Sequence, residues 1–332
     1  MGFPAPEPRL TPAPEAVERF RAGLSAVWPE GERPEARLAV AVSGGPDSTA
    51  LLLLAHAALP GRVEAATVDH ALRPESAQEA AGVAALCARL GVPHETLTVE
   101  VAPGNVQAEA RSARYGAMAA WILRRGLSAL ATAHHADDQA ETLLMRLNRA
   151  SGVAGLAGAR GRGVVPVPDT AIPLLRPLLD WRRAELGDVV ADVETVQDPS
   201  NSNDRFDRVR MRKALASADW LDVAAIARSA EHLAEADAAL DWMATLEWRS
   251  CVSKEPMGLR YRPQAPRAVV LRVLARCITE LGGEEPRGGA VARLLESLRE
   301  GRPASIGDLV VRPNAGGWSF AKAPVRAVRR KS

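Results

Sequence analysis

The chain has 332 residues, of which 47% are hydrophobic, enough for two domains that each have a core of their own. No apolar run reaches the roughly 18 residues that a membrane-spanning helix needs. A net charge of +2 is too small by itself to indicate nucleic-acid binding. These values favour a globular, soluble protein and exclude an integral membrane protein.

The first predicted feature in chain order is a proline-rich terminus, and we expect residues 1–20 to form a disordered extension. The three cysteines, Cys87, Cys251 and Cys277, are too far apart to form a C-x-x-C pair. This spacing argues against a disulfide framework, a zinc ribbon and an iron–sulfur cluster. We therefore expect reduced thiols and a cytoplasmic location.

Strands and helices then alternate through the first half of the chain. Predicted strands lie at 37–42, 63–70, 94–101 and 127–135, and predicted helices at 47–58, 75–90, 105–126 and 136–148. This alternation predicts an α/β fold with a parallel sheet and helices on both faces. Ligands bind beyond the carboxyl ends of such strands, so the polar segments there are expected to meet at one rim.

The second half of the chain has a different pattern. Residues 150–168 are rich in glycine and predict a mobile loop, and a mostly irregular stretch and a basic helix follow. An alanine-rich helix at 219–250 leads to two further helices and a short strand pair at 265–320. We therefore predict a first domain at 21–215, a linker helix at 216–250, and a smaller, mostly helical domain at 251–332.

The segment Ser43-Gly44-Gly45-Pro46-Asp47-Ser48 joins the first strand to the first helix. Backbone N–H groups at the start of a helix favour an anion, and glycines let the backbone approach a phosphate closely. The alternative is a plain helix start capped by Asp47 or Ser48, which leaves the double glycine unexplained. No lysine follows this segment, as one does in the loops that transfer the γ-phosphoryl group of a nucleotide. The loop is therefore better suited to hold pyrophosphate as a leaving group.

The second motif covers residues 134–142 and begins with two histidines. Asp137 and Glu141 are four residues apart and share a helix face, with Asp138 beside them, which predicts a cation site. Two alternatives stay open. Asp137 and Asp138 could only complement the helix dipole, or His134 and Asp138 could bind a transition metal, for which no third ligand is evident.

Two groups of basic residues complete the candidate site. Arg111 and Arg114 are three residues apart on one helix, where a guanidinium fork suits a phosphate. A basic run lies in the basic helix that follows the irregular stretch. It comprises Arg205, Arg208, Arg210, Arg212 and Lys213. Taken alone, each group is better explained by a solvated helix face.

These motifs carry a family resemblance. The loop at 43–48 resembles the S-G-G-x-D-S loop of the N-type ATP pyrophosphatases, which adenylate an oxygen and release pyrophosphate. Over residues 37–215 the chain is similar to the tRNA(Ile)-lysidine synthases. The similar segments, in order, are 67–76, 110–115, 134–147, 151–158 and 198–212.

The resemblance implies a Rossmann-like, adenine nucleotide alpha hydrolase-like fold and a ligase that uses ATP and Mg²⁺. Its substrates would be free L-lysine and tRNA(Ile) with a CAU anticodon, whose first anticodon cytidine is adenylated on the C2 oxygen and then attacked by lysine. The domain at 21–215 would be catalytic and the one at 251–332 would bind tRNA.

The resemblance also implies residue roles. The loop residues Ser43 to Ser48 would hold the ATP phosphates, and Asp47 would also bind Mg²⁺. Arg111 would contact the α-phosphate, and His134 would lie near the nucleotide. Asp137 and Glu141, beside Asp138, would bind lysine and accept its proton, and the basic run from Arg205 to Lys213 would grip the tRNA.

The chain departs from the family pattern at two positions. Ala150 stands where the family usually has glycine, and Val209 stands where asparagine is common, which removes one expected hydrogen bond to the tRNA. The length corresponds to the short form of the family.

A tRNA thiolation enzyme is the nearest competing hypothesis, but sulfur delivery needs paired cysteines, which this sequence does not have. A nucleotide-binding module without catalysis would lack the acidic helix.

Overall fold

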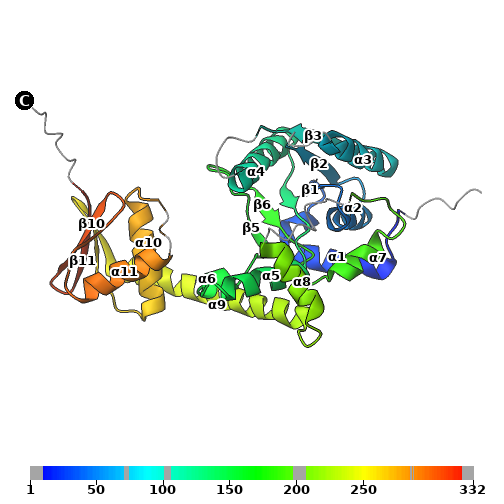
Figure 1. Cartoon of the computed structure of the whole chain (residues 1–332). Helices are drawn as coiled ribbons and strands as arrows, with labels where there is room; N and C mark the ends of the chain where they lie inside the picture. The colour runs from blue at the N-terminus through cyan, green and yellow to red at the C-terminus, as the bar shows by residue number, and fades with distance from the viewer. Residues whose placement is uncertain are drawn as a thin grey trace, which may run out of the picture. The chain divides into compact units, whose positions relative to one another are not determined.

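The computed structural model describes residues 10–70, 75–100, 106–196, 207–284, 286 and 288–323. The chain divides into two compact units, Met1–Ala234 and Glu235–Ser332. The division falls inside a long helix, α9 (Val223–Cys251), which Figure 1 draws in yellow-green to yellow. Helix α9 covers residues 223–250 of the predicted linker helix at 216–250, and the two units divide within this helix rather than at the predicted boundaries 215 and 251.

A six-stranded sheet forms the centre of the first unit, in the order β3-β2-β1-β4-β6-β5 (Figure 1). All neighbouring strands are parallel except β5 and β6. The strands are β1 (Leu38–Ala41), β2 (Val63–Asp69), β3 (His94–Thr98), β4 (Ala129–Ala131), β5 (Arg162–Val164) and β6 (Pro173–Leu175). The predicted parallel sheet is confirmed, although β3 and β4 are shorter than predicted.

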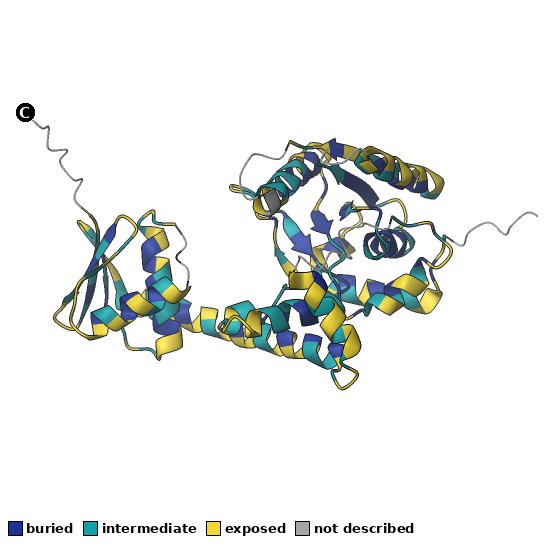
Figure 2. Cartoon of the chain, in the orientation of Figure 1, coloured by how far each residue is buried: buried dark blue, intermediate teal, exposed yellow. Residues whose placement is uncertain are grey.

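Helices cover both faces of this sheet. The helices of the first unit are α1 (Pro14–Val27), α2 (Pro46–Ala58), α3 (Glu75–Leu90), α4 (Val106–Arg125), α5 (Ala136–Leu147), α6 (Val153–Leu156), α7 (Arg183–Val189) and α8 (Asp207–Ser217), with a 3-10 turn at Pro29–Glu32. Leu38 and Val40 of β1 share a core with α1, α2 and α3, whereas Ala39 shares a core with α4. Figure 2 shows the central strands of this sheet as largely buried, and β1, β2 and β4 are made up mostly of buried residues. Within the described ranges, no helix is both long and apolar enough to cross a membrane.

The prediction of a disordered extension over residues 1–20 is wrong from residue 14 onward. Helix α1 begins at Pro14, and its Phe20 and Leu24 are buried at 0% and 4% exposure. Val17 packs against the same core, which gives an apolar face with helical spacing. Proline in the first turn of a helix loses no hydrogen bond, so the proline-rich composition concealed a helix start.

The described residues between 150 and 217 are more regular than predicted. The expected mobile loop at 150–168 contains α6 and β5, and β5 pairs with β6 at the edge of the sheet. Helix α5 packs against α6 and α8, and α7 packs against α2. Helix α5, which carries most of the polar segment at 134–142, therefore contacts helices that come later in the sequence.

The second unit combines a five-stranded antiparallel sheet with helices. Its order is β7-β8-β11-β10-β9. Its elements after α9 are β7 (Val252–Glu255), β8 (Gly258–Tyr261), α10 (Arg267–Glu280), α11 (Gly288–Arg299), β9 (Ala304–Ile306), β10 (Leu309–Asn314) and β11 (Gly317–Lys322). Helical residues outnumber strand residues, as predicted, and the predicted strand pair is β10 with β11. The short strands β7, β8 and β9 were not predicted.

Candidate active site

The segment between β1 and α2 forms a tight loop held by its own side chains. The Ser43 amide donates to Ser48 Oγ at 3.1 Å, and the two serine hydroxyl oxygens lie 3.1 Å apart. Ser48 Oγ also donates to the carbonyl of Gly45 at 3.0 Å. Gly44 has a φ of +85°, which favours glycine. The loop thus has a specific backbone shape that depends on its serines and on Gly44.

The first turn of α2 presents backbone N–H groups that a phosphate could accept. Gly45 is the N-cap residue, and no described side chain caps the helix. Pro46 has no N–H, so the first amides of the helix belong to Asp47 and Ser48. The alternative in which Asp47 or Ser48 caps the helix is therefore wrong. Uncapped amides and the helix dipole together favour an anion at this position.

The two glycines of the loop should respond differently to alanine. A Cβ at Gly44 would lie 2.9 Å from Val196 Cγ2 and 3.2 Å from Val83 Cγ2, whereas a Cβ at Gly45 would meet nothing closer than Ser43 Oγ at 3.6 Å. We expect Gly44→Ala to lower the free energy of unfolding by about 2 kcal/mol, because left-handed strain and crowding add. Gly45→Ala is the matched control and should cost less than half as much in urea unfolding. Equal losses would contradict this description of the loop.

Asp47 lies at the start of α2, close to the first turn of α5. Its Oδ2 is 3.4 Å from His135 Nε2 and 3.8 Å from Arg183 Nη2. Burial alone would raise the pKa of Asp47, but hydrogen bonding to His135 and the charges of His135 and Arg183 bring it below its ordinary value. Its Oδ1 is buried and has no hydrogen-bond partner among the described residues. A buried carboxylate oxygen beside a phosphate site fits Mg²⁺, which typically takes one or two carboxylates and phosphate oxygens.

His135, the second of the two adjacent histidines, contacts Asp47. His135 is fully buried at the N-cap of α5, and its amide donates to Asp138 Oδ2 at 3.2 Å. His134 Nδ1 instead lies 3.1 Å from Thr132 Oγ1. The open alternative of a transition-metal site at His134 and Asp138 gains no third ligand, because the described residues contain no group of three His, Cys, Asp or Glu arranged for a metal.

His134 gives a pH-dependent prediction. Burial lowers the pKa of His134 from 6.5 to about 4, with Asp138 opposing the shift and Arg176 and Arg208 adding to it. Between these two values the unfolded chain binds a proton that the folded chain does not, so the free energy of unfolding falls as the pH drops from 6.5 towards 4. The contribution is about 3 kcal/mol at about 1.4 kcal/mol per pH unit. His134→Asn should remove it in urea unfolding measured across this range, and an unchanged slope would contradict the assignment.

Asp137 is held by the residues that begin α7. Arg182 Nε and Nη2 donate to its two oxygens at 3.1 and 3.2 Å, and the Arg183 amide donates to Oδ2 at 2.8 Å. Burial would raise the pKa of Asp137, but these hydrogen bonds and the charge of Arg182 lower it. Both oxygens of Asp137 therefore have partners on the side of α5 that faces α7.

Asp138 and Glu141 face α8 instead. Arg208 donates from Nη2 to Asp138 Oδ1 and from Nε to Glu141 Oε2, both at 2.8 Å. Arg212 Nε donates to Glu141 Oε1, also at 2.8 Å. Asp137 and Glu141 therefore have different arginine partners, and their joint binding of the lysine ammonium stays a prediction. Asp138 and Glu141, three residues apart on α5, share one guanidinium, because three-residue spacing also places side chains on one face.

A second group of arginines surrounds Tyr115 on α4. The guanidinium carbons of Arg111 and Arg114 lie 4.9 and 5.1 Å from the centre of the Tyr115 ring. Burial, and the charge of Arg111, lower the pKa of Arg176 at the end of β6, against the opposite effect of Tyr115. Within the described ranges, none of the three arginines pairs with a carboxylate. Positive charge without a counter-ion among the described residues favours an anion here, and the role of Arg111 as a phosphate ligand stays a prediction.

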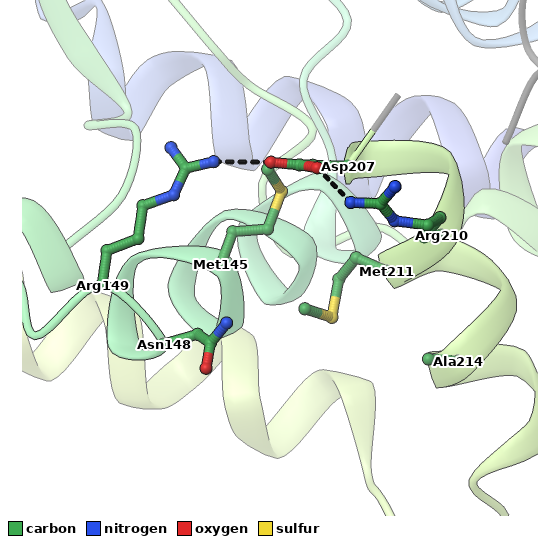
Figure 3. A pocket seen from close by; sticks show the side chains of 7 residues that line it. All are labelled: Met145, Asn148, Arg149, Asp207, Arg210, Met211 and Ala214. Atoms are coloured by element: carbon green, nitrogen blue, oxygen red, sulfur yellow. Dashed lines mark hydrogen bonds and ion pairs between the residues drawn. The ribbon is translucent and has the colours of Figure 1, made fainter. Parts of the chain in front are cut away.

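Four residues of the basic run lie on α8, namely Arg208, Arg210, Arg212 and Lys213, whereas Arg205 lies outside the described residues. Arg210 does not reach Asp138 and Glu141, which are called the acidic pair below. It donates to Asp207 Oδ1 at 2.5 Å, and Arg149 donates to the other oxygen at 2.8 Å (Figure 3). These residues line a cavity of about 290 Å³ between α5 and α8. The basic run thus divides into arginines that cover the acidic pair and one that faces the cavity.

Comparison with known proteins decides the family. Residues 17–218 match the family model of the PP-loop domain. A tRNA(Ile)-lysidine synthase from Novosphingobium aromaticivorans is 48% identical over 314 residues, covering 93% of this chain and 94% of that protein. The chain belongs to the tRNA(Ile)-lysidine synthase family. A second family member, from Zymomonas mobilis, is 40% identical over 298 residues and covers 87% of this chain and 89% of its own length.

A more distant likeness is to a solved structure. The U34-tRNA thiolase from Methanococcus maripaludis, solved with its [4Fe-4S] cluster, aligns with a TM-score of 0.54 at 14% identity. The alignment covers 66% of this chain and 80% of that one. At this identity it shows a shared fold, and it agrees with the predicted adenine nucleotide alpha hydrolase-like sheet.

The two departures from the pattern of the tRNA(Ile)-lysidine synthase family have structural contexts. Val209 is 7% exposed on α8, so this side chain faces the protein interior. Ala150 has a φ of +51°, a conformation in which glycine is favoured. The residue roles implied by the family resemblance omit three residues near the site. His135 lies within the motif at 134–142 but received no role, whereas Arg182 and Arg183 lie in no motif. The only local signal for the two arginines is the capping box of α7, in which Arg182 is the N-cap and Glu185 the N3 residue.

Proposed function

We propose that this chain joins free L-lysine to C2 of the first anticodon cytidine of tRNA(Ile) with a CAU anticodon. ATP first adenylates the C2 oxygen, which forms an O–P bond and releases pyrophosphate. The ε-amine of lysine then attacks C2, loses a proton, and displaces AMP, which carries the former C2 oxygen. The product, lysidine, pairs with A rather than G and switches the amino acid specificity of the tRNA from methionine to isoleucine.

The observation that carries this proposal is the contact of His135 with two different groups. Its Nε2 lies 3.4 Å from Asp47 Oδ2, and its amide donates to Asp138 Oδ2 at 3.2 Å. One buried residue, His135, therefore connects the loop at 43–48 to the acidic pair on α5. A reaction that activates an oxygen with ATP and then admits an amine needs these two sites side by side.

The loop at 43–48, called the phosphate loop here, would bind ATP through the amides of Gly44, Gly45, Asp47 and Ser48 and through the hydroxyls of Ser43 and Ser48. Mg²⁺, when bound, offsets the negative charge on the leaving pyrophosphate. Asp47 would hold this ion through its unpartnered, buried Oδ1. Arg111 would contact the α-phosphate, since the Tyr115 cluster supplies positive charge that has no described counter-ion. AMP then leaves far more readily than an amide-like oxygen would.

Asp138 and Glu141 would receive the lysine substrate. The ε-amine has an ordinary pKa of about 10.4, so lysine arrives as an ammonium ion and must lose a proton before it attacks C2. Two carboxylates on one helix face bind such a cation and lie where its proton must go. Asp137, whose oxygens are held by Arg182 and Arg183, would position the first turn of α5.

The tRNA would be held through its phosphates. An enzyme that modifies a nucleobase draws it out of the base stack and grips the flanking backbone. Arg205, Arg208, Arg210, Arg212 and Lys213 would supply this grip beside the acidic pair, and the second unit would contact the tRNA elsewhere. We also assign the reaction to the cytoplasm, where ATP, free lysine and tRNA occur together.

Delivery of sulfur to the same carbon is the competing reaction. It requires cysteines that carry the sulfur or bind a cluster. Cys87 and Cys277 are buried on α3 and α10, in different units of the chain, and burial raises the pKa of each thiol to about 12. Buried thiols with raised pKa values make poor sulfur carriers, so lysine ligation is the better supported reaction.

The proposal is tested by incubating the purified full-length chain with Mg-ATP, labelled L-lysine and a tRNA(Ile) transcript with a CAU anticodon. We expect label in the RNA only when all three substrates are present, together with one AMP and one pyrophosphate per lysine. A transcript with a UAU anticodon is the matched control and should take up no label. Absence of label from the CAU transcript would contradict the proposal.

A further inference from the structure

The acidic pair on α5 is already occupied by side chains of the same protein. Arg208 and Arg212 donate to both oxygens of Glu141, and Arg208 also donates to Asp138. All three ion pairs measure 2.8 Å, the length of a charge-assisted hydrogen bond. A lysine ammonium would need the same oxygens, so the substrate and the two arginines compete for one site.

The two arginines also cover the site. The Glu141 side chain is 1% exposed, whereas the side chains of Arg208 and Arg212 are 45% and 29% exposed. Solvent therefore reaches the outer side of both guanidinium groups but hardly reaches the carboxylate beneath them. A phosphate group could approach the arginines from solvent, but an ammonium ion could not approach Glu141 until they move.

From this arrangement, and resting on the function proposed above, we infer that Arg208 and Arg212 couple tRNA binding to lysine binding. Phosphates of the bound tRNA draw the two guanidinium groups away from Glu141 and Asp138. A buried carboxylate left without a cation is strongly unfavourable. The ε-ammonium of lysine supplies the missing charge, so each substrate favours the binding of the other.

This coupling must be reciprocal. If tRNA raises the affinity for lysine by a given factor, lysine raises the affinity for tRNA by the same factor. Typical coupling factors are about 5- to 150-fold. We expect a factor of at least about tenfold here, because three charge-assisted contacts are exchanged.

The coupling is measured on the unmodified full-length protein by equilibrium binding. Labelled L-lysine is titrated in the presence and absence of the tRNA(Ile) transcript, and the transcript is titrated with and without saturating lysine. An ATP analogue with a methylene group between the α- and β-phosphorus atoms prevents the reaction. We expect both dissociation constants to fall by the same factor. A lysine affinity that does not change with tRNA would overturn the inference.

Two single substitutions on α8 form a matched test. Arg212→Gln removes one of the two cations on Glu141, so lysine should bind several-fold more tightly without tRNA, and the coupling factor should shrink. Arg210→Gln removes the same charge from the same helix, but this side chain pairs with Asp207 and does not touch the acidic pair. It should weaken tRNA binding yet leave the lysine affinity without tRNA unchanged. If both variants behave alike, general charge loss explains the effect and the coupling role is wrong.

Failure of this inference is distinguishable from failure of the proposed function. A protein that forms lysidine but binds lysine equally well with and without tRNA retains its function and loses the coupling. A protein that forms no lysidine loses both. The wild-type titrations decide the point even if a variant fails to fold.

Discussion

Asp47→Asn should lower the maximal rate of pyrophosphate release by about 10²- to 10³-fold, the usual loss when one preorganised charge stabiliser is removed. The change keeps the shape of the side chain but removes the charge that pairs with His135 and faces Arg183. It also weakens Oδ1 as a ligand for Mg²⁺. The measurement is pyrophosphate release at saturating ATP, lysine and tRNA, over a series of Mg²⁺ concentrations.

The matched control for Asp47→Asn is Asp188→Asn. Asp188 is an exposed carboxylate on α7, and the same loss of charge there should change the rate less than about twofold. For Asp47→Asn the Mg²⁺ concentration at half-maximal rate should rise. If the rate falls but its Mg²⁺ dependence stays the same, Asp47 acts through His135 and not as a metal ligand.

Glu141→Gln should raise the KM for lysine by about 10- to 100-fold, because a charged hydrogen bond is typically worth about 1.5 to 3 kcal/mol. Glu141 is almost wholly buried, and its two oxygens are the deepest acceptors of the acidic pair. The KM for ATP should change little, since the proposed phosphate site is the loop at 43–48 and not the acidic pair. Steady-state kinetics with each substrate varied in turn separates the two effects.

Asp137→Asn is the informative comparison for Glu141→Gln. The sequence pattern alone treats Asp137 and Glu141 as an equivalent pair, four residues apart. The structure ties Asp137 to Arg182 and Arg183, so its substitution should raise the lysine KM much less than Glu141→Gln does. Equal increases in KM would restore the original pairing and contradict the role given to Asp138.

Much of the first unit could be predicted because its signals are local. The alternation of apolar strands with helices of regular length determines a parallel sheet, and the topology rule then locates the polar segments at one rim. Helix α1 was missed because its apolar face begins within a proline-rich stretch. The strands β5 to β9 are three or four residues long, too short for any periodic signal.

The candidate site could be predicted by residue type better than by geometry. Two adjacent histidines follow β4, which ends at Ala131, so no strand alternation determines which of them points towards Asp47. Likewise, Asp137 and Asp138 both lie in the first turn of α5, and either can pair with Glu141. Contacts with α7 and α8, which come about 45 to 70 residues later, decide the outcome. Such long-range contacts leave no pattern in the local sequence.

The proposed reaction activates the C2 oxygen of a cytidine and replaces it with lysine. It is tested most directly with tRNA(Ile) that carries ¹⁸O at C2 of its first anticodon cytidine. After reaction with ATP and lysine, the nucleosides and the AMP are analysed by mass spectrometry. We predict lysidine in the RNA and one ¹⁸O atom in the phosphate of AMP. Retention of ¹⁸O in the RNA, or a thiolated cytidine formed when a sulfur donor is added, would contradict the account.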